Sequence, residues 1–207
     1  MKVNLKLLKK ADYCKATDKN RKYLYNVFVR YNEDDTVTYL ASNGHVLYRA
    51  IEKLEETPEE AEKEYFKKGV LFNYEWQKVK DRDIVSLELY KGEEGYVKII
   101  MKDIDKRIIT VEQPICDLDF PNIEGVIPAD ITEDNKRFLD NRMTVFSWKN
   151  QLIMEKLGFY WENMIHYNIG TDFQPARFDI NNKKEGIQET FVMMPCRTFW
   201  ENYGYNN

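Results

Sequence analysis

The chain has 207 residues, of which 43% are hydrophobic and 32% charged, so it can build a core in one or two domains. It has no apolar run of membrane-spanning length and no apolar N-terminal segment typical of a secretory signal, so we expect a cytoplasmic protein without membrane association. Three widely separated cysteines provide neither a disulfide framework nor a paired zinc motif. The formal net charge of -4, taken as an average, argues against a nucleic-acid partner.

The charge is unevenly distributed. Residues 1–30 contain nine Lys or Arg and two Asp, a local net charge of +7. Residues 52–64 contain seven Glu and two Lys, a local net charge of -5. The acidic run is typical of a solvated loop or a short helix. The basic segment makes a local interaction with a polyanion compatible with an acidic chain.

A helix is predicted over residues 4–17, because apolar residues recur there with helical spacing. These residues are Leu7, Leu8, Ala11 and Cys14. A second face of the helix is basic, with Lys6, Lys9, Lys10 and Tyr13, and Lys15 at its edge. Strands are then predicted at 23–31, 36–40 and 45–51.

A second helix is predicted from Asn73, as N-cap, to Asp81, with Lys78, Lys80 and Arg82 near its end. Strands follow at 84–90, 96–102 and 107–111, and the proline-bounded segment 120–131 is typical of a linker. Beyond it we predict a strand at 144–146, a helix at 147–157, and strands at 164–169, 176–180 and 190–194. The order indicates an α+β fold of repeated units, each with one helix and a small antiparallel sheet. Residues 1–129 would form a domain of two units, and residues 130–207 a shorter domain of one unit.

The sequence offers little for catalysis. Its two histidines, His45 and His166, lie in a predicted turn and a predicted strand, and no nucleophile, phosphate-loop or zinc-protease motif is present. Asp117 and Asp119 are more typical of a solvated turn than of a cation site, and Cys196 of a buried small residue. We therefore expect no enzymatic activity, no cofactor and no metal, unless a metal were found beside one of the histidines.

Three segments resemble, in the same order, the bacterial sliding clamp, the beta subunit of DNA polymerase III. Residues 21–47 are similar to part of its middle domain, where the family has a Thr-Asp-Gly-His-Arg-Leu turn. This chain keeps Gly44, His45 and Leu47 but has Ser42, Asn43 and Val46 at the other positions. Residues 120–128, FPNIEGVIP, are similar to the family's Phe-Pro-Asp-Tyr segment, and residues 191–197, FVMMPCR, to its C-terminal strand.

The resemblance implies a hydrophobic cleft between the last two clamp domains, where peptides of polymerases and other replication factors dock. Carried over by position, the cleft would comprise Tyr25, Ser42, Gly44, His45, Val46, Leu47, Pro121, Gly125, Val126, Val192, Met193, Met194, Pro195 and Cys196. The alternative is that 192–194 is only a core strand and Gly44 only a turn glycine. The first basic helix falls where the family has a helix that lines the DNA-facing hole. The expected DNA contacts are Lys6, Lys9, Lys10, Tyr13, Lys15, Lys78, Lys80 and Arg82.

Two functional hypotheses follow from the resemblance. The first is a clamp-like replication processivity factor, encoded by a phage or mobile element, that holds double-stranded DNA without base readout and tethers a polymerase through the cleft. The second is a monomeric clamp-derived adaptor that binds the same peptides without encircling DNA. Family clamps have three domains per chain, whereas this chain is predicted to hold three half-domain units, so the sequence leaves open whether it forms a homo-oligomer.

Overall fold

A computed structural model describes residues 1–73, 84–123, 125–129, 146–160, 165–167, 175–182 and 184–195. The chain divides into two units. The first comprises Met1–Pro121 with Asn181–Glu189, and the second comprises Asn122–Ile180 with Thr190–Asn207. The hairpin formed by the last two strands thus has its tip in the first unit and its other end in the second.

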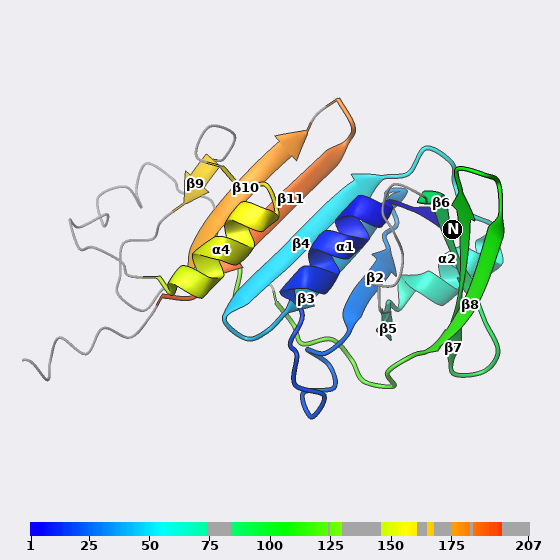
Figure 1. Ribbon diagram of the computed structural model, residues 1–207, viewed down its shortest axis with the longest axis horizontal. Helices are drawn as coiled ribbons and strands as arrows, with labels where there is room; N and C mark the ends of the chain where they lie inside the picture. Colours follow the sequence, from blue (N-terminus) through cyan, green and yellow to red (C-terminus); the bar gives the residue numbers. More distant parts are fainter. Residues whose placement is uncertain are drawn as a thin grey trace, which may run out of the picture. The chain divides into compact units, whose positions relative to one another are not determined.

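Two antiparallel sheets form the first unit (Figure 1). One has the order β5-β2-β3-β4, and the other the order β1-β6-β7-β8. The strands of the first sheet are β2 (Val27–Tyr31), β3 (Thr36–Ser42), β4 (Val46–Lys53) and β5 (Val70–Phe72). Those of the second are β1 (Lys2–Val3), β6 (Ile84–Lys91), β7 (Tyr96–Asp103) and β8 (Ile108–Pro114).

The two halves of the first unit exchange their first strands. β1 precedes the three strands β2, β3 and β4 in the chain, yet it pairs with β6, placing Lys2 opposite Glu88 and Val3 opposite Leu87. β5 precedes β6, β7 and β8, yet it pairs with β2. Each sheet therefore contains a strand from the other half, and neither sheet is complete without both halves of the sequence.

Helix α1 (Leu5–Cys14) lies across the first sheet and contacts β2, β3 and β4 (Figure 1). Its buried stripe consists of the four residues predicted from the periodicity, Leu7, Leu8, Ala11 and Cys14, each 2% exposed or less. The helix begins at Asn4, whose Oδ1 accepts hydrogen bonds from the N–H groups of Lys6 (3.1 Å) and Leu7 (3.4 Å). This packing presents the opposite side of α1, including exposed Lys6 and Tyr13, to solvent.

The Glu-rich run contains the short helix α2 (Glu60–Lys67). Acidic residues in its first turn and Lys67 in its last suit the helix dipole, and Phe66 is its buried residue. Gly69 follows the helix with φ +83, where a Cβ would lie 2.1 Å from the Phe28 ring. The chain can enter β5 at this point because glycine has no Cβ and tolerates positive φ.

The second unit contains α4 (Trp148–Lys156), β9 (Ile165–Tyr167), β10 (Ala176–Asn182) and the end of β11 (Ile187–Met193). β9 and β10 pair antiparallel, and α4 lies over β10 and β11 (Figure 1). Its core includes the ring of Phe191, which lies 5.7 Å from that of Phe159 and 6.3 Å from that of Phe178, centroid to centroid. This unit has a single described helix on antiparallel strands.

The α+β class is confirmed, and most predicted elements are present with shifted ends. α1 ends three residues early, because Lys15 is extended (ψ 161) and the N–H of Ala16 bonds to the carbonyl of Leu24 at 2.8 Å. The strand expected from residue 23 starts at Val27, after a turn centred on hydrogen bonds to the Arg21 carbonyl. The sequence patterns did not predict β1 or β5. For the acidic run they left open a loop or a short helix, and the structure has a short helix at Glu60–Lys67. The helix expected at 73–81 lies, apart from Asn73, outside the described residues, as does most of the strand expected at 144–146.

Candidate functional site

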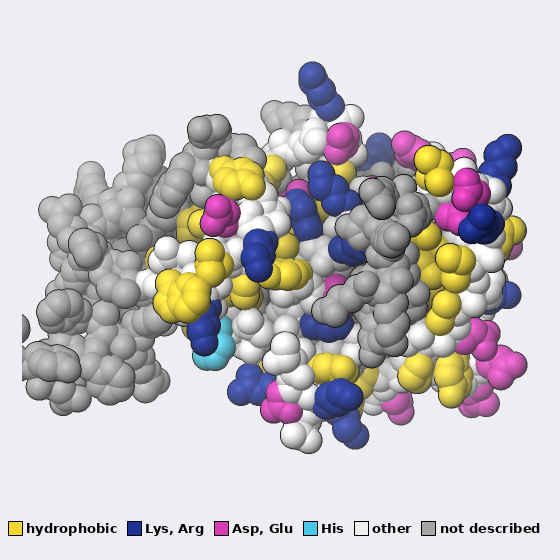
Figure 2. All heavy atoms as spheres, in the orientation of Figure 1, with side chains coloured by type: hydrophobic (Ala, Val, Ile, Leu, Met, Phe, Trp, Pro, Cys, Tyr) yellow, Lys and Arg dark blue, Asp and Glu magenta, His cyan; other side chains and the backbone are white. Residues whose placement is uncertain are grey.

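The exposed side of α1 is the first candidate site. Lys6 is exposed and its ammonium has no ion-pair partner among the described residues. Lys9 is half-buried and Tyr13 is 46% exposed. Figure 2 looks onto this side of the first unit and shows several Lys and Arg side chains around α1, with groups of Asp and Glu side chains toward the sheet that contains β6, β7 and β8.

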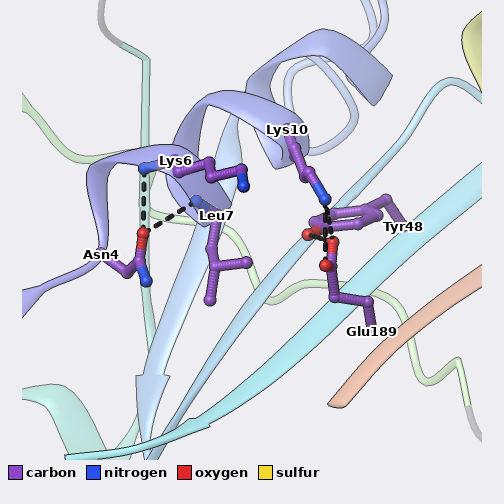
Figure 3. A network of polar contacts seen from close by, with 6 residues as sticks. All are labelled: Asn4, Lys6, Leu7, Lys10, Tyr48 and Glu189. Atoms are coloured by element: carbon purple, nitrogen blue, oxygen red, sulfur yellow. Dashed lines mark hydrogen bonds and ion pairs between the residues drawn. The ribbon is translucent and has the colours of Figure 1, made fainter. Parts of the chain in front are cut away.

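Lys10 differs from its neighbours because its charge is compensated within the protein (Figure 3). Its Nζ lies 2.6 Å from Oε2 and 2.9 Å from Oε1 of Glu189. The Tyr48 hydroxyl donates to Glu189 Oε2 at 2.5 Å. Burial, and then the Glu189 carboxylate, raise the pKa of Tyr48, so its phenol stays protonated and keeps donating. The side chains of Lys10 and Glu189 are only 16% and 10% exposed, so this triad ties α1 to β4 and to the tip of the β10–β11 hairpin.

Lys15 is also engaged within the protein. Its Nζ lies 2.5 Å from Asp12 Oδ1, donates to Asn73 Oδ1, and stands 5.6 Å above the centre of the Tyr25 ring. Burial raises the pKa of Asp12, and the hydrogen bond from Lys15 opposes that rise. Of the other expected DNA contacts on α1, Lys6 and Tyr13 are exposed and Lys9 is half-buried. Lys78, Lys80 and Arg82 lie outside the described residues.

The N-terminal end of α1 is held by a partly buried chain of hydrogen bonds. The Asn4 N–H donates to the Tyr39 hydroxyl at 2.9 Å, and that hydroxyl donates to Glu52 Oε2 at 2.8 Å. Asn4 Nδ2 donates to the second Glu52 oxygen at 2.9 Å. Burial and the nearby Glu52 carboxylate raise the pKa of Tyr39, which keeps this donor protonated. These bonds set the direction in which the exposed lysines of α1 point.

The second candidate site begins at the β3–β4 turn. Ser42 Oγ donates to the Val46 carbonyl at 2.7 Å and accepts from the Gly44 N–H at 3.0 Å. Asn43 Oδ1 accepts from the N–H groups of His45 (2.8 Å) and Val46 (3.0 Å). Gly44 has φ +90, a conformation that L side chains rarely adopt. The Ser42-to-Val46 segment is thus a tight, internally hydrogen-bonded turn, also held by Arg21, which donates to the Asn43 carbonyl at 3.2 Å, and its His45 is exposed.

The predicted cleft residues differ in how accessible they are. Val46, Leu47, Val192 and Met193 are core residues, each 4% exposed or less, and Ser42 is 9% exposed. His45, Gly44, Pro121, Gly125 and Val126 are exposed, and Tyr25, Met194 and Pro195 are half-buried. Cys196 lies outside the described residues. Tyr25, residues 42–47 and Pro121 belong to the first unit, and the remaining described members to the second.

A cavity of about 790 Å³ lies elsewhere, beside the N-terminal end of α1. Both lysines and glutamates line it, among them Lys2, Lys53, Glu55 and Lys184. None of its lining residues belongs to the predicted cleft, although Lys6 is among them. The sequence patterns gave no sign of this cavity, because its walls come from four segments that are distant in the chain.

No family model matches the chain, and no curated protein matches it. Solved structures do. The DNA polymerase III beta chain of Streptococcus pneumoniae matches with a TM-score of 0.64 at 15% identity, over 96% of this chain and 64% of that one. The sliding clamp of Bacillus subtilis matches with a TM-score of 0.64 at 16% identity, over 93% and 62% of the two chains. The chain has the fold of a bacterial sliding clamp.

A sliding clamp from Pseudomonas aeruginosa bound to griselimycin is also similar, with a TM-score of 0.65 at 14% identity, over 93% of this chain and 63% of that one. The chain therefore spans less than two thirds of the length of these clamps. Such low identities establish the fold alone. Among the described residues, no helix is long and apolar enough to cross a membrane.

Proposed function

We propose that this protein is a clamp-like replication factor that holds double-stranded DNA without reading its sequence, and that has no catalytic activity of its own. The observation that supports this most is the orientation of α1 within a sliding-clamp fold. The helix buries its apolar stripe on β3 and β4 and presents Lys6 and Tyr13 to solvent, with half-buried Lys9 on the same helical face. Lysines on an exposed helical face meet phosphates as mobile point charges, which favours loose backbone contact.

The test is binding of a fluorescent 30-base-pair duplex, measured by anisotropy at several salt concentrations. The variant K6E/K9E reverses the charges of exposed Lys6 and half-buried Lys9 on α1. The matched control K68E/K91E makes the same change of net charge at two exposed lysines, Lys68 directly after α2 and Lys91 at the end of β6. Lys10 is left unchanged, because its loss would leave Glu189 buried without its cation. We expect the α1 variant to lose DNA binding and the control to retain it; equal binding by both variants would refute the assignment to α1.

The second part of the proposal is that the protein binds peptides of replication proteins, with His45 of the first unit and Val126 of the second as separate candidate contacts. It is supported by the clamp fold and by the exposure of both residues, with Val126 at 41%. The probe is a fluorescent peptide that copies the clamp-binding segment of a bacterial replicative polymerase. We expect V126E to weaken its binding and V85E, a matched change at an exposed valine of β6, to leave it intact. Peptide binding that survives both V126E and an added H45E would contradict both assignments.

An adaptor that binds such peptides without holding DNA is the alternative. It is favoured by one observation: Lys10 and Lys15, two of the five candidate contacts predicted on the first basic helix, are paired within the protein. The two experiments separate these functions. Peptide binding without measurable duplex binding at low salt indicates the adaptor, whereas duplex binding lost in K6E/K9E indicates the clamp-like factor.

A further inference from the structure

The outer edge of β8 is an accessible apolar strand. The order β1-β6-β7-β8 places it at the end of its sheet, with β7 on one side and no paired strand on the other in the described part of the chain. Ile108 is 64% exposed and Ile109 is 40% exposed. Glu112 is the only charged residue of the seven, and a proline occurs only at the last position. An edge of this kind is a template for another strand.

The backbone groups that face outward can be identified. The Asp103 N–H bonds to the Arg107 carbonyl at 3.1 Å, and the Ile115 N–H bonds to the Gly95 carbonyl at 2.9 Å. With the observed register, odd-numbered residues of β8 therefore exchange hydrogen bonds with β7. The N–H and C=O groups of Ile108, Thr110 and Glu112 consequently point away from the sheet.

We propose that two copies of this chain pair through β8, antiparallel, about a two-fold axis at Thr110. A two-fold axis perpendicular to the sheet places the core-facing sides of both copies on the same face of the joined sheet. Even-numbered residues of one copy must then lie opposite even-numbered residues of the other, and odd-numbered opposite odd-numbered. With Thr110 opposite Thr110 of the second copy, Ile108 lies opposite Glu112 of that copy, and all three outward N–H groups find carbonyls. A register shifted by two residues places Ile108 opposite Pro114, which has no N–H to donate.

Side chains favour the same register. Ile109 and Val111 lie opposite Met101 and Ile99 of β7, respectively. Met101 and Ile99 are each 0% exposed, so Ile109 and Val111 extend the core-facing layer of the sheet to its edge. In the dimer, Ile109 of each copy meets Val111 of the other and covers this layer. On the opposite face the two threonines meet, and a Thr–Thr pair is a favourable cross-strand contact. Glu112 also lies diagonally across from Lys106 of the second copy.

A single pair of strands buries less area than a stable dimer interface, so the association is expected to be weak and concentration-dependent. It uses no residue of the candidate DNA-contacting side and neither of the candidate peptide contacts, and it does not depend on the proposed function. An extended peptide from a different protein could use the same edge, and the experiment below distinguishes the two, because only self-pairing places Thr110 opposite itself.

The test uses sedimentation velocity of the full chain from micromolar to near-millimolar concentration. T110K and T110E each place like charges opposite each other at the axis, so both are expected to raise the dissociation constant about tenfold or more. An equimolar mixture of the two is expected to dimerise again, which also shows that both variants are folded. T17K, a matched change at an exposed threonine outside β8, should behave as wild type.

Three outcomes would overturn the proposal. The wild-type chain could remain monomeric over the whole range. T110K could associate as strongly as wild type, which would place the contact on another surface. The mixture of T110K and T110E could stay monomeric, which would exclude pairing at this register.

Discussion

Replacing Lys10 with methionine removes the positively charged partner of the nearly buried Glu189 carboxylate. Glu189 is held by Lys10 at 2.6 Å and by the Tyr48 hydroxyl at 2.5 Å, and only 10% of its side chain is exposed. Loss of one partner of a buried ion pair typically costs about 3–5 kcal/mol, because the remaining charge stays desolvated. The partial exposure of Lys10, at 16%, lets some water reach the site, so we expect about 3 kcal/mol for K10M.

A second substitution tests the cause of that loss. In K10M/E189Q the site is neutral, and the glutamine carbonyl still accepts the hydrogen bond from Tyr48. We therefore expect the double variant to be within about 1 kcal/mol of wild type and more stable than K10M alone. The Lys63–Glu60 pair on α2 provides the matched control, since Glu60 is 88% exposed. K63M should cost about 0.5 kcal/mol or less.

The assay is urea unfolding followed by far-UV circular dichroism. A loss of 3 kcal/mol should lower the midpoint by about 1 M or more, whereas the Lys63 control should shift it only slightly. The reasoning is refuted if K10M is as stable as K63M, or if adding E189Q to K10M restores no stability. Either result would mean that the enclosed carboxylate contributes nothing beyond an ordinary surface charge.

Three further predictions concern the framework of the first unit. N4A should destabilise by about 1–2 kcal/mol in urea unfolding, through loss of the cap of α1 and of its bond to β4, and N4S should recover the cap contribution. G69A should be far more damaging than G95A in thermal unfolding, since both glycines have φ near +80 but only at Gly69 would a Cβ meet a ring of β2, at 2.1 Å. The hydrogen bond to Asp35 raises the pKa of Tyr31 to about 12, so D35N should lower that pKa in an NMR titration. Because the raised pKa means that folding favours the protonated phenol, its contribution to the free energy of unfolding is complete below pH 10.0 and is lost as the pH rises toward about 12. An unchanged Tyr31 titration in D35N, equal losses in G69A and G95A, or a wild-type midpoint in N4A would contradict the respective argument.

Local patterns predicted the elements that carry their own periodicity. The buried stripe of α1 follows helical spacing, and the alternation in β6 and β7 marks one covered face. β1 and β5 escaped prediction because two and three residues are too few to show a period, and they are strands only through pairing with the opposite half of the unit.

The candidate site was predictable to a lesser degree. Resemblance identified the β3–β4 turn, and its Ser, Asn and Gly residues do form a tight, hydrogen-bonded turn. It gave no measure of burial, so Val46 and Leu47 entered the list of cleft residues although their side chains are in the core. The pairing of Lys10 with Glu189 spans 179 positions and had no local signal at all.

This pairing changes how the charge of α1 should be weighed. Formal charges assign the helix four lysines next to DNA, but two of them, Lys10 and Lys15, already have carboxylate partners within the protein. If only Lys6 and Lys9 meet phosphates, log K should fall with log salt with a slope of about -1.8, whereas four contacts would give about -3.6. A shallow slope means that few counterions are released, and hence that the electrostatic binding is weak enough for the protein to move along DNA. A slope steeper than about -1.8 would mean that further cations meet phosphates. These would be Lys10 and Lys15 after leaving their carboxylates, or the other expected contacts, Lys78, Lys80 and Arg82.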